Sequence, residues 1–126
     1  MIAVETRGAD SFAQSLAAGV QIELPAITSI ATSLGAKRVS AAAFELAQRG
    51  PVESIVVSDA AALAGCYDLL NEHRILVEPA CGASVAALST DSPLLAAAQD
   101  VVVVVCGGVG VSVEQLAAWR VQLTPA

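Results

Sequence analysis

The sequence predicts a three-layer α/β fold with a mostly parallel β-sheet. Short apolar runs alternate with helical patterns along the whole chain, an order typical of parallel sheets flanked by helices. Five consecutive valines, Val101–Val105, stand between Asp100 and Gly107. A continuous run of β-branched residues is typical of a central strand that is covered on both faces.

The composition indicates more apolar surface than one small domain usually buries. The 126 residues are 56% hydrophobic and only 14% charged, whereas globular chains average roughly 45–50% and about 25%. The excess of apolar residues is expected for a sheet that is covered on both faces. It is also expected for part of a larger protein whose apolar face packs against a segment that is missing here. Because no linker or repeat divides the chain, residues 1–126 are expected to form a single, partial domain.

Charge and hydropathy argue against nucleic-acid and membrane partners. The net charge is −6, and no basic cluster exists beyond Lys37 and Arg38, whereas phosphate backbones require concentrated positive charge. The longest uncharged stretches, 24–36 and 101–113, are shorter than the roughly 20 apolar residues of a membrane-spanning helix. The charged N-terminal residues are unlike a signal peptide, and three cysteines form no disulfide pattern. A cytoplasmic location is therefore expected.

Periodicity and turn residues predict the individual elements. Ser40 and Asp59 are candidate N-caps, and Ser112 with Gln115 matches a capping box. Leu116, Trp119 and Leu123 would give the last helix its apolar face. Extended segments are expected at Ile2–Glu5, Ser54–Ser58, Ile75–Val77 and Val101–Val105, and helices at Ser11–Ala18, Ile27–Leu34, Ser40–Gln48, Asp59–Asn71, Ala83–Leu88, Ser92–Gln99 and Ser112–Leu123.

The first candidate site is the glycine-rich turn in VVVVVCGGVG, ahead of the last helix. Ligands of open α/β sheets bind at the carboxyl ends of strands, and glycines there allow a ligand to approach the backbone. A tight turn between a strand and a helix would explain the same residues. The turn does not match the G-x-G-x-x-G pattern of dinucleotide-binding folds, which speaks against a mononucleotide domain.

The second candidate site lies in ILVEPACGASVAAL. Glu78 follows an extended segment, a position where a glutamate serves a ligand about as often as it caps a helix or faces solvent. Cys81 could act as a nucleophile, but no histidine lies near it in the sequence, so a structural role is favoured.

These two stretches, in this order and at this spacing, resemble the C-terminal part of the mammalian-type serine dehydratases. That family reads VEPACGAA and then VVIVCGG. The N-terminal VETRGADSF and LPAITSIATSLGAK also resemble the family's VETFGAHSF-like and LPKITSVAKALGVK segments, so the resemblance covers nearly the whole chain. It implies part of the large domain of a fold-type II pyridoxal-phosphate enzyme.

The resemblance also implies roles for individual residues. Cys106 falls where the family places a residue beside the pyridine nitrogen of the cofactor, Gly107 follows it, and Ser33 falls where a small residue lines the substrate side. Four further positions fall where the family binds a monovalent cation such as K⁺, for which oxygen ligands are suited. They are the side chain of Glu5 and the backbone carbonyls of Ala9, Leu34 and Ala36.

Two features depart from the family. Val109–Gly110 replaces the Ser-Asn or Asn that usually follows the two glycines, so polar groups beside the cofactor ring are lost. The Schiff-base lysine and the phosphate-binding loop belong to the family's N-terminal part, and the only lysine here is Lys37, which resembles a non-catalytic loop residue. No catalytic residue is therefore expected within this chain.

The resemblance implies α,β-elimination of L-serine or L-threonine to pyruvate or 2-oxobutanoate and ammonia. The chain alone is expected to be inactive and to need a missing N-terminal half or a complementary subunit, in an enzyme that is a homodimer when complete. Two alternatives remain: another eliminase or racemase of fold-type II, or a non-catalytic fragment that binds a partner through its surplus apolar face.

Overall fold

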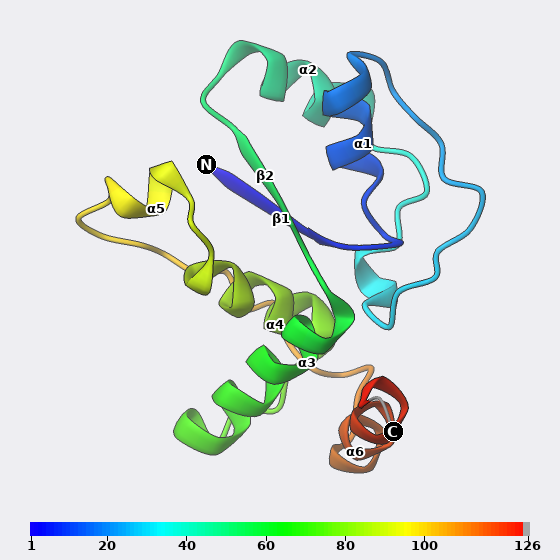
Figure 1. Cartoon of the computed structure of the whole chain (residues 1–126), viewed down its shortest axis with the longest axis vertical. Coiled ribbons are helices and arrows are strands. Elements are labelled where there is room, and N and C mark those ends of the chain that lie inside the picture. The colour runs from blue at the N-terminus through cyan, green and yellow to red at the C-terminus, as the bar shows by residue number, and fades with distance from the viewer. Residues whose placement is uncertain (125–126) are drawn as a thin grey trace.

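The computed structural model describes residues 1–124 and contains one parallel pair of strands surrounded by helices (Figure 1). Strand β1 (Ile2–Thr6) pairs with β2 (Glu53–Val57) over all five positions, in a register that sets Ile2 opposite Glu53. Both strands were expected from their apolar runs. The helices and short helical turns are α1 (Ser11–Ala18), η1 (Thr32–Leu34), α2 (Ala41–Arg49), α3 (Asp59–Asp68), η2 (Leu69–His73), α4 (Pro79–Ala86), η3 (Ala87–Ser89), α5 (Pro93–Ala96) and α6 (Val113–Leu123).

Local capping chemistry explains several helix boundaries. Helix α1 ends at Gly19, which adopts a left-handed conformation at φ 69°. The hydroxyl of Ser40 accepts a hydrogen bond from the backbone N–H of Ala43, and that of Ser112 accepts one from Gln115. The predicted starts of α2 and α6 are thus confirmed.

The N-cap of α3 is one residue earlier than predicted. Ser58, not Asp59, accepts the capping hydrogen bond, from the N–H of Ala61. The carboxylate of Asp59 instead accepts hydrogen bonds from the Ser29 hydroxyl at 2.5 Å and from the Ile30 N–H at 3.1 Å. Asp59 therefore fixes the irregular segment before η1 to the start of α3.

Three helix predictions were wrong in extent. The helix expected at Ile27–Leu34 is absent except for the turn η1, since Thr and Ser favour local hydrogen bonds over helix. The helix expected at Ala83–Leu88 begins earlier, at Pro79, and α4 ends at Ala86. A proline is tolerated at the first helical position because the N–H that it lacks would have no partner there. The helix expected at Ser92–Gln99 is the single turn α5.

The strand predicted at Val101–Val105 is also wrong for this chain. These residues form no strand, and Ile75–Val77 forms none either. Val102 is 90% exposed and Val104 is 67% exposed. The fold is therefore mixed α/β with a parallel sheet, but the described residues supply only two of its strands. Apolar residues alone do not make a strand, because its backbone groups also need hydrogen-bond partners.

The core lies where α3 crosses α4. Gly65 and Gly82 face each other there, so closely that a Cβ on either residue would overlap backbone of the other helix. One buried cluster (Leu63, Cys66, Val77, Cys81 and Leu116) joins α3 and α4 to α6, and a second (Val57, Ala62 and Ala83) joins them to the strands. Among residues 1–124 no helix has the length and hydropathy needed to cross a bilayer.

Candidate functional site

The glycine-rich turn 106–110 is held at its start by Cys81 of α4 and by Glu78, the residue before α4. The Sγ atom of Cys81 accepts hydrogen bonds from the backbone N–H groups of Cys106 at 3.2 Å and Gly107 at 3.4 Å. The same thiol lies 3.3 Å from the Gly107 carbonyl oxygen, to which it can donate, and the N–H of Glu78 donates to that oxygen at 3.2 Å. Cys81 is buried, so these contacts fix the backbone of the turn from inside.

The two glycines of the turn have different reasons to be glycine. Gly107 has φ 141°, a conformation that side chains rarely adopt, and open space lies where its Cβ would be. Gly108 packs against the backbone of Leu76 and Val77, so closely that a Cβ would collide with the Leu76 carbonyl oxygen. The turn is therefore anchored on one side and open on the other.

The predicted cofactor residues lie on different parts of the molecule. Cys106 directly follows Val105 and is exposed, so its thiol is free to meet a ligand at the open side of the turn. Ser33 is also exposed and belongs to η1, while Gly107 is partly buried. The fold thus places Ser33 and Cys106 on two separate segments, each with a side chain open to a ligand.

Glu5, the one side chain among the predicted cation ligands, binds the start of α1. The two carboxylate oxygens of Glu5 accept hydrogen bonds from the N–H groups of Phe12 at 3.0 Å and Ala13 at 2.8 Å. Burial raises the pKa of Glu5, and the nearby charge of Asp10 acts in the same direction, whereas the two N–H groups lower it. Glu5 thus has a structural role at the helix N-terminus, where a negative charge is favourable.

The three predicted carbonyl ligands come from two segments of the chain, Ala9 ahead of α1 and Leu34 and Ala36 at the end of η1 and after it. The Ala36 carbonyl accepts a hydrogen bond from the Ser11 hydroxyl at 2.7 Å, and the Leu34 carbonyl accepts one from the Ala36 N–H. Ala9 is fully buried just ahead of α1. Each carbonyl oxygen has a second lone pair, so the donor set still suits a hard cation in kind. The described residues contain no group of three or more metal-ligating side chains.

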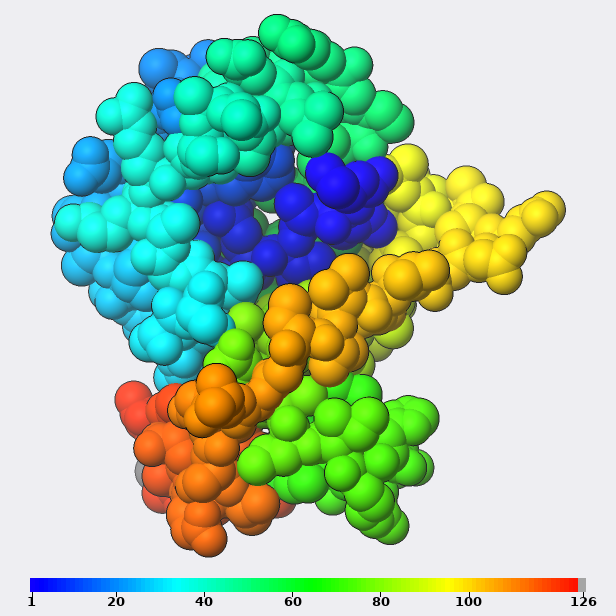
Figure 2. Space-filling model, turned by 180° about the vertical axis from the view of Figure 1, so that it is seen from behind, coloured from blue at the N-terminus to red at the C-terminus, as the bar shows by residue number. Residues whose placement is uncertain are grey.

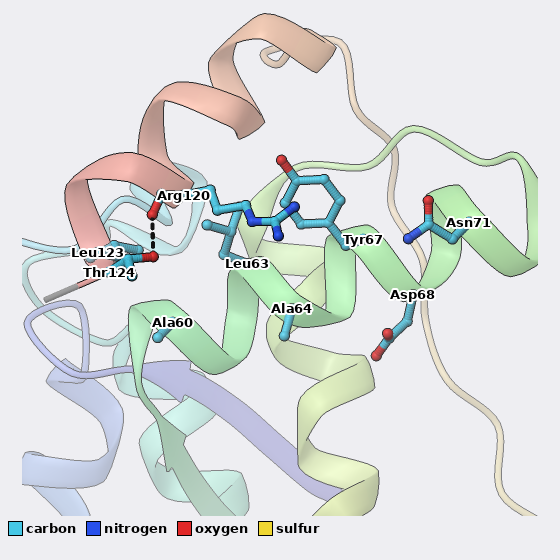
Figure 3. A pocket seen from close by; sticks show the side chains of 9 residues that line it. All are labelled: Ala60, Leu63, Ala64, Tyr67, Asp68, Asn71, Arg120, Leu123 and Thr124. Atoms are coloured by element: carbon cyan, nitrogen blue, oxygen red, sulfur yellow. Dashed lines mark hydrogen bonds between the residues drawn. The ribbon is translucent and has the colours of Figure 1, made fainter. Parts of the chain in front are cut away.

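A separate hollow lies between α3, η2 and α6 (Figure 3). Its volume is about 340 Å³, and the guanidinium of Arg120 lies 5.4 Å from the centre of the Tyr67 ring. A cation over an aromatic face is attractive, so this pair helps to hold α6 against α3. None of the candidate site residues predicted from the sequence lines this hollow.

Sequence reasoning favoured a structural role for Cys81 over that of a nucleophile, but it did not identify the contact. In the structure the buried thiol anchors the turn 106–110. The spacing of 25 residues between Cys81 and Cys106 offered no local pattern. The signal lay in the order of the two stretches, EPACGA and CGG, which the fold brings together.

Comparison with known proteins identifies the family of this chain. Residues 1–107 match the family described as "Pyridoxal-phosphate dependent enzyme". The chain belongs to this family. It is 45% identical to a mouse protein named "Serine dehydratase-like" and 43% identical to human "L-serine dehydratase/L-threonine deaminase", in each case over 98% of this chain and 40% of the relative.

A solved structure extends the likeness to three dimensions. The fungal L-serine ammonia-lyase from Rhizomucor miehei superimposes with a TM-score of 0.89 at 35% identity, over 98% of this chain and 41% of that chain. The fold is that of the fold-type II pyridoxal-phosphate enzymes. The chain spans about 40% of the length of the curated relatives it matches, and within that span it corresponds to their C-terminal part.

Proposed function

We propose that this chain is the C-terminal portion of a pyridoxal-phosphate-dependent L-serine dehydratase that also accepts L-threonine. The observation that carries the proposal is the exposed Cys106 thiol on a turn anchored by Cys81 and Glu78. In this position a thiol can be a weak hydrogen-bond partner of the ring nitrogen of the cofactor. The family match and the serine dehydratase names of its relatives support the substrate class.

The residues of this chain fit one wall of the cofactor site. Cys106 would meet the ring nitrogen, and the open backbone at Gly107 leaves room for a ring to approach closely. The cofactor, when bound, supplies the electron sink for elimination. The chain itself would orient the ring, while Ser33 would face the substrate, and Val109–Gly110 would offer no polar side chain beside it.

The remaining chemistry would come from outside this chain. Lys37 is the only lysine and is exposed on the loop after η1, so we assign it no catalytic role. We therefore propose a single, partial domain that works with a complementary polypeptide in a cytoplasmic, homodimeric enzyme. On this proposal the isolated chain releases no pyruvate from L-serine and pyridoxal phosphate, and release above background would overturn it.

Variants of Cys106 test the proposed contact in a reconstituted enzyme. Cys106→Ser keeps a group that can make the same hydrogen bond, so the rate of elimination should stay near wild type. Cys106→Asp should lower the rate by roughly 5- to 150-fold, the equivalent of about 1–3 kcal/mol, and should shift the absorbance of the bound cofactor, because a carboxylate favours a protonated ring. Gln99→Glu adds a negative charge before the valine run and is the matched control. Wild-type rate and absorbance in the Asp variant would contradict the assignment.

We further propose that K⁺ binds at Glu5 and at the carbonyls of Ala9, Leu34 and Ala36. The oxygen donors of this set support the choice. Replacing choline chloride by KCl at equal ionic strength should raise the Tm of the chain, because a ligand that binds only the folded state stabilises it. Glu5→Gln should abolish this difference, and Glu45→Gln, on the exposed side of α2, should retain it. An equal response of wild type and Glu5→Gln would contradict the site.

A further inference from the structure

The sulfur of Cys81 lies against the backbone of a second cysteine, Cys106. Its Sγ atom is 3.2 Å from the Cys106 nitrogen and 3.4 Å from the Gly107 nitrogen, although 25 residues separate the two cysteines in the sequence. The same Sγ atom is 3.3 Å from the Gly107 carbonyl oxygen. All of these contacts are made within this chain. A buried thiol thus lies next to the residue that carries an exposed thiol.

This arrangement is close to the geometry of a disulfide. In a disulfide the two Cα atoms lie roughly 4.4–6.8 Å apart. Three covalent bonds and the 3.2 Å contact connect the Cα atoms of Cys81 and Cys106, which limits their separation to about 7.5 Å at most. Open space lies beside Gly107, so the turn has room for the small movement that closure of an S–S bond requires.

The two thiols differ in their access to solvent. Cys106 is exposed, whereas the exposed fraction of Cys81 is only 2%. Figure 2 shows the orange segment that leads to the turn at the surface of the molecule, with green helices beneath it. Oxidation of cysteine proceeds through the thiolate and favours exposed thiols. A small oxidant would therefore react with Cys106 first, and Cys81 is in place to react second.

We propose that Cys106 and Cys81 form a site of reversible oxidation by hydroperoxides, in which a disulfide closes between them. The Cys106 thiolate attacks one oxygen of hydrogen peroxide, so that an S–O bond forms and the O–O bond breaks. Hydroxide leaves and takes up the proton that Cys106 released. The Cys81 sulfur then attacks the Cys106 sulfur, so that the S–S bond forms, the S–O bond breaks, and the second hydroxide leaves as water with the Cys81 proton. Two electrons pass from the sulfurs to the peroxide.

The bond would change the turn as well as the two thiols. The side chain of Cys106 would turn from the open side of the turn toward α4, so it could no longer meet a ligand there. Cys81 would lose its S–H group, which can donate to the Gly107 carbonyl oxygen. The disulfide needs neither cofactor nor substrate, so this proposal goes beyond the proposed enzymatic function and does not depend on it.

Cys66 is a competing partner, because it belongs to the same buried cluster as Cys81. It is fully buried, and burial raises its pKa to about 11, so it stays a thiol at neutral pH. Proteolysis separates the two pairings. Trypsin leaves Cys81 and Cys106 together on the peptide 75–120, which has no internal lysine or arginine, and leaves Cys66 on the peptide 50–74.

Peptide mapping of the purified chain tests the site. The reduced chain is treated with hydrogen peroxide at about pH 8.5, where ordinary thiols are partly ionised, and the remaining thiols are alkylated in urea before digestion. The peptide 75–120 should lose two hydrogen atoms and take up no alkyl group, whereas Cys66 should be alkylated. Dithiothreitol should restore both thiols. Oxidation carried out in urea should lose this preference, because the contact between Cys81 and Cys106 is lost.

Two serine variants test the order of the two steps. In Cys81→Ser the second sulfur is absent, so peroxide should leave a sulfenic acid on Cys106, which dimedone traps. In Cys106→Ser the exposed thiol is absent, and the thiol of Cys81 should react with peroxide about tenfold more slowly than Cys106 does in wild type.

Four outcomes would overturn the proposal. They are alkylation of both cysteines of the peptide 75–120 after peroxide treatment, a lasting sulfenic acid on Cys106 of the wild type, a disulfide that includes Cys66 or a second molecule, and an equal yield of the Cys81–Cys106 disulfide in urea. Since the readout is peptide mass, none of these outcomes counts against the proposed elimination activity.

Discussion

Two segments of this chain have the sequence pattern of a buried strand, but only one of them forms a strand. Glu53–Val57 contains a glutamate and a serine, yet it pairs with β1 at every position and ends at the buried Val57. Val101–Val105 is more apolar, yet it is unpaired and largely exposed. Strand propensity is thus a statement about side chains, whereas pairing depends on whether a free edge lies alongside.

The helix pair behind β2 explains part of the difference. Helix α3 follows β2 after a single capping serine, and α4 packs tightly on α3 through facing glycines, so the paired strand has a firm support. The valine run is fixed only after its end, where Cys81 and Glu78 hold Gly107. The contrast between a packed region and a region with one anchor can be tested by substitution.

The largest effect is expected at the crossing of α3 and α4. In Gly82→Ala the new methyl group would overlap the Ala62 carbonyl oxygen and lie 2.7 Å from the Cys66 Sγ atom. The free energy of unfolding should fall by about 3 kcal/mol, measured by urea denaturation. Gly50→Ala, where the nearest atom would lie 3.7 Å from the added methyl group and φ is −135°, is the control and should change little. Equal stabilities of the two variants would mean that the packed region is looser than described.

The buried thiol of the packed region should make stability depend on pH. Burial raises the pKa of Cys66 from 9.0 to about 11. Between these values the unfolded chain releases the proton while the folded chain keeps it, so stability is full below pH 9 and falls as pH rises toward 11. The fall due to this thiol should be about 2–3 kcal/mol.

Denaturation curves at about pH 8.5 and about pH 10.5, on either side of the ordinary thiol pKa, check this dependence. Cys66→Ala should lose most of it, whereas Cys106→Ser, which removes the exposed thiol, should keep it. An unchanged pH dependence in Cys66→Ala would show that other groups are responsible.

A smaller effect is expected when the two strand-like segments are compared by the free energy of unfolding of a valine-to-alanine variant in each. Val57→Ala removes a buried side chain and should lower the free energy of unfolding by about 2 kcal/mol. Val102→Ala removes an exposed one and should change it by less than about 0.5 kcal/mol. Comparable losses would indicate that the side chain of Val102 is packed in the isolated chain.

The smallest effect is expected at the anchor of the turn. Cys81→Ala removes the hydrogen-bond partner of two N–H groups and should cost about 1 kcal/mol. Amide exchange at Cys106 and Gly107 should become faster, while β1 and β2 are unaffected. Cys81→Ser keeps a group that can donate and accept, so it should retain part of the protection. Unchanged exchange in Cys81→Ala would refute the anchoring role.

Sequence alone determined the elements whose signals are local. Helix α1 has the bounds that the sequence predicts, and α6 begins one residue after its predicted Ser112 and shares its end, because caps and a nearby apolar face act within a few residues. The resemblance carried by EPACGA and CGG indicated the family and the fold type, and both are confirmed. Local signals could not predict the irregular segment before η1, where Asp59 from α3 supplies the hydrogen bonds.

Only the tertiary structure decided how the turn 106–110 is held and which of the predicted strands form. The thiol of Cys81 meets the Cys106 turn because α4 lies beneath it, a contact between residues far apart in the sequence. The amino acids of Val101–Val105 fit a central strand equally well whether or not a neighbour is present. Pairing requires backbone groups of another segment within hydrogen-bond reach, and within residues 1–124 the fold brings none to this run.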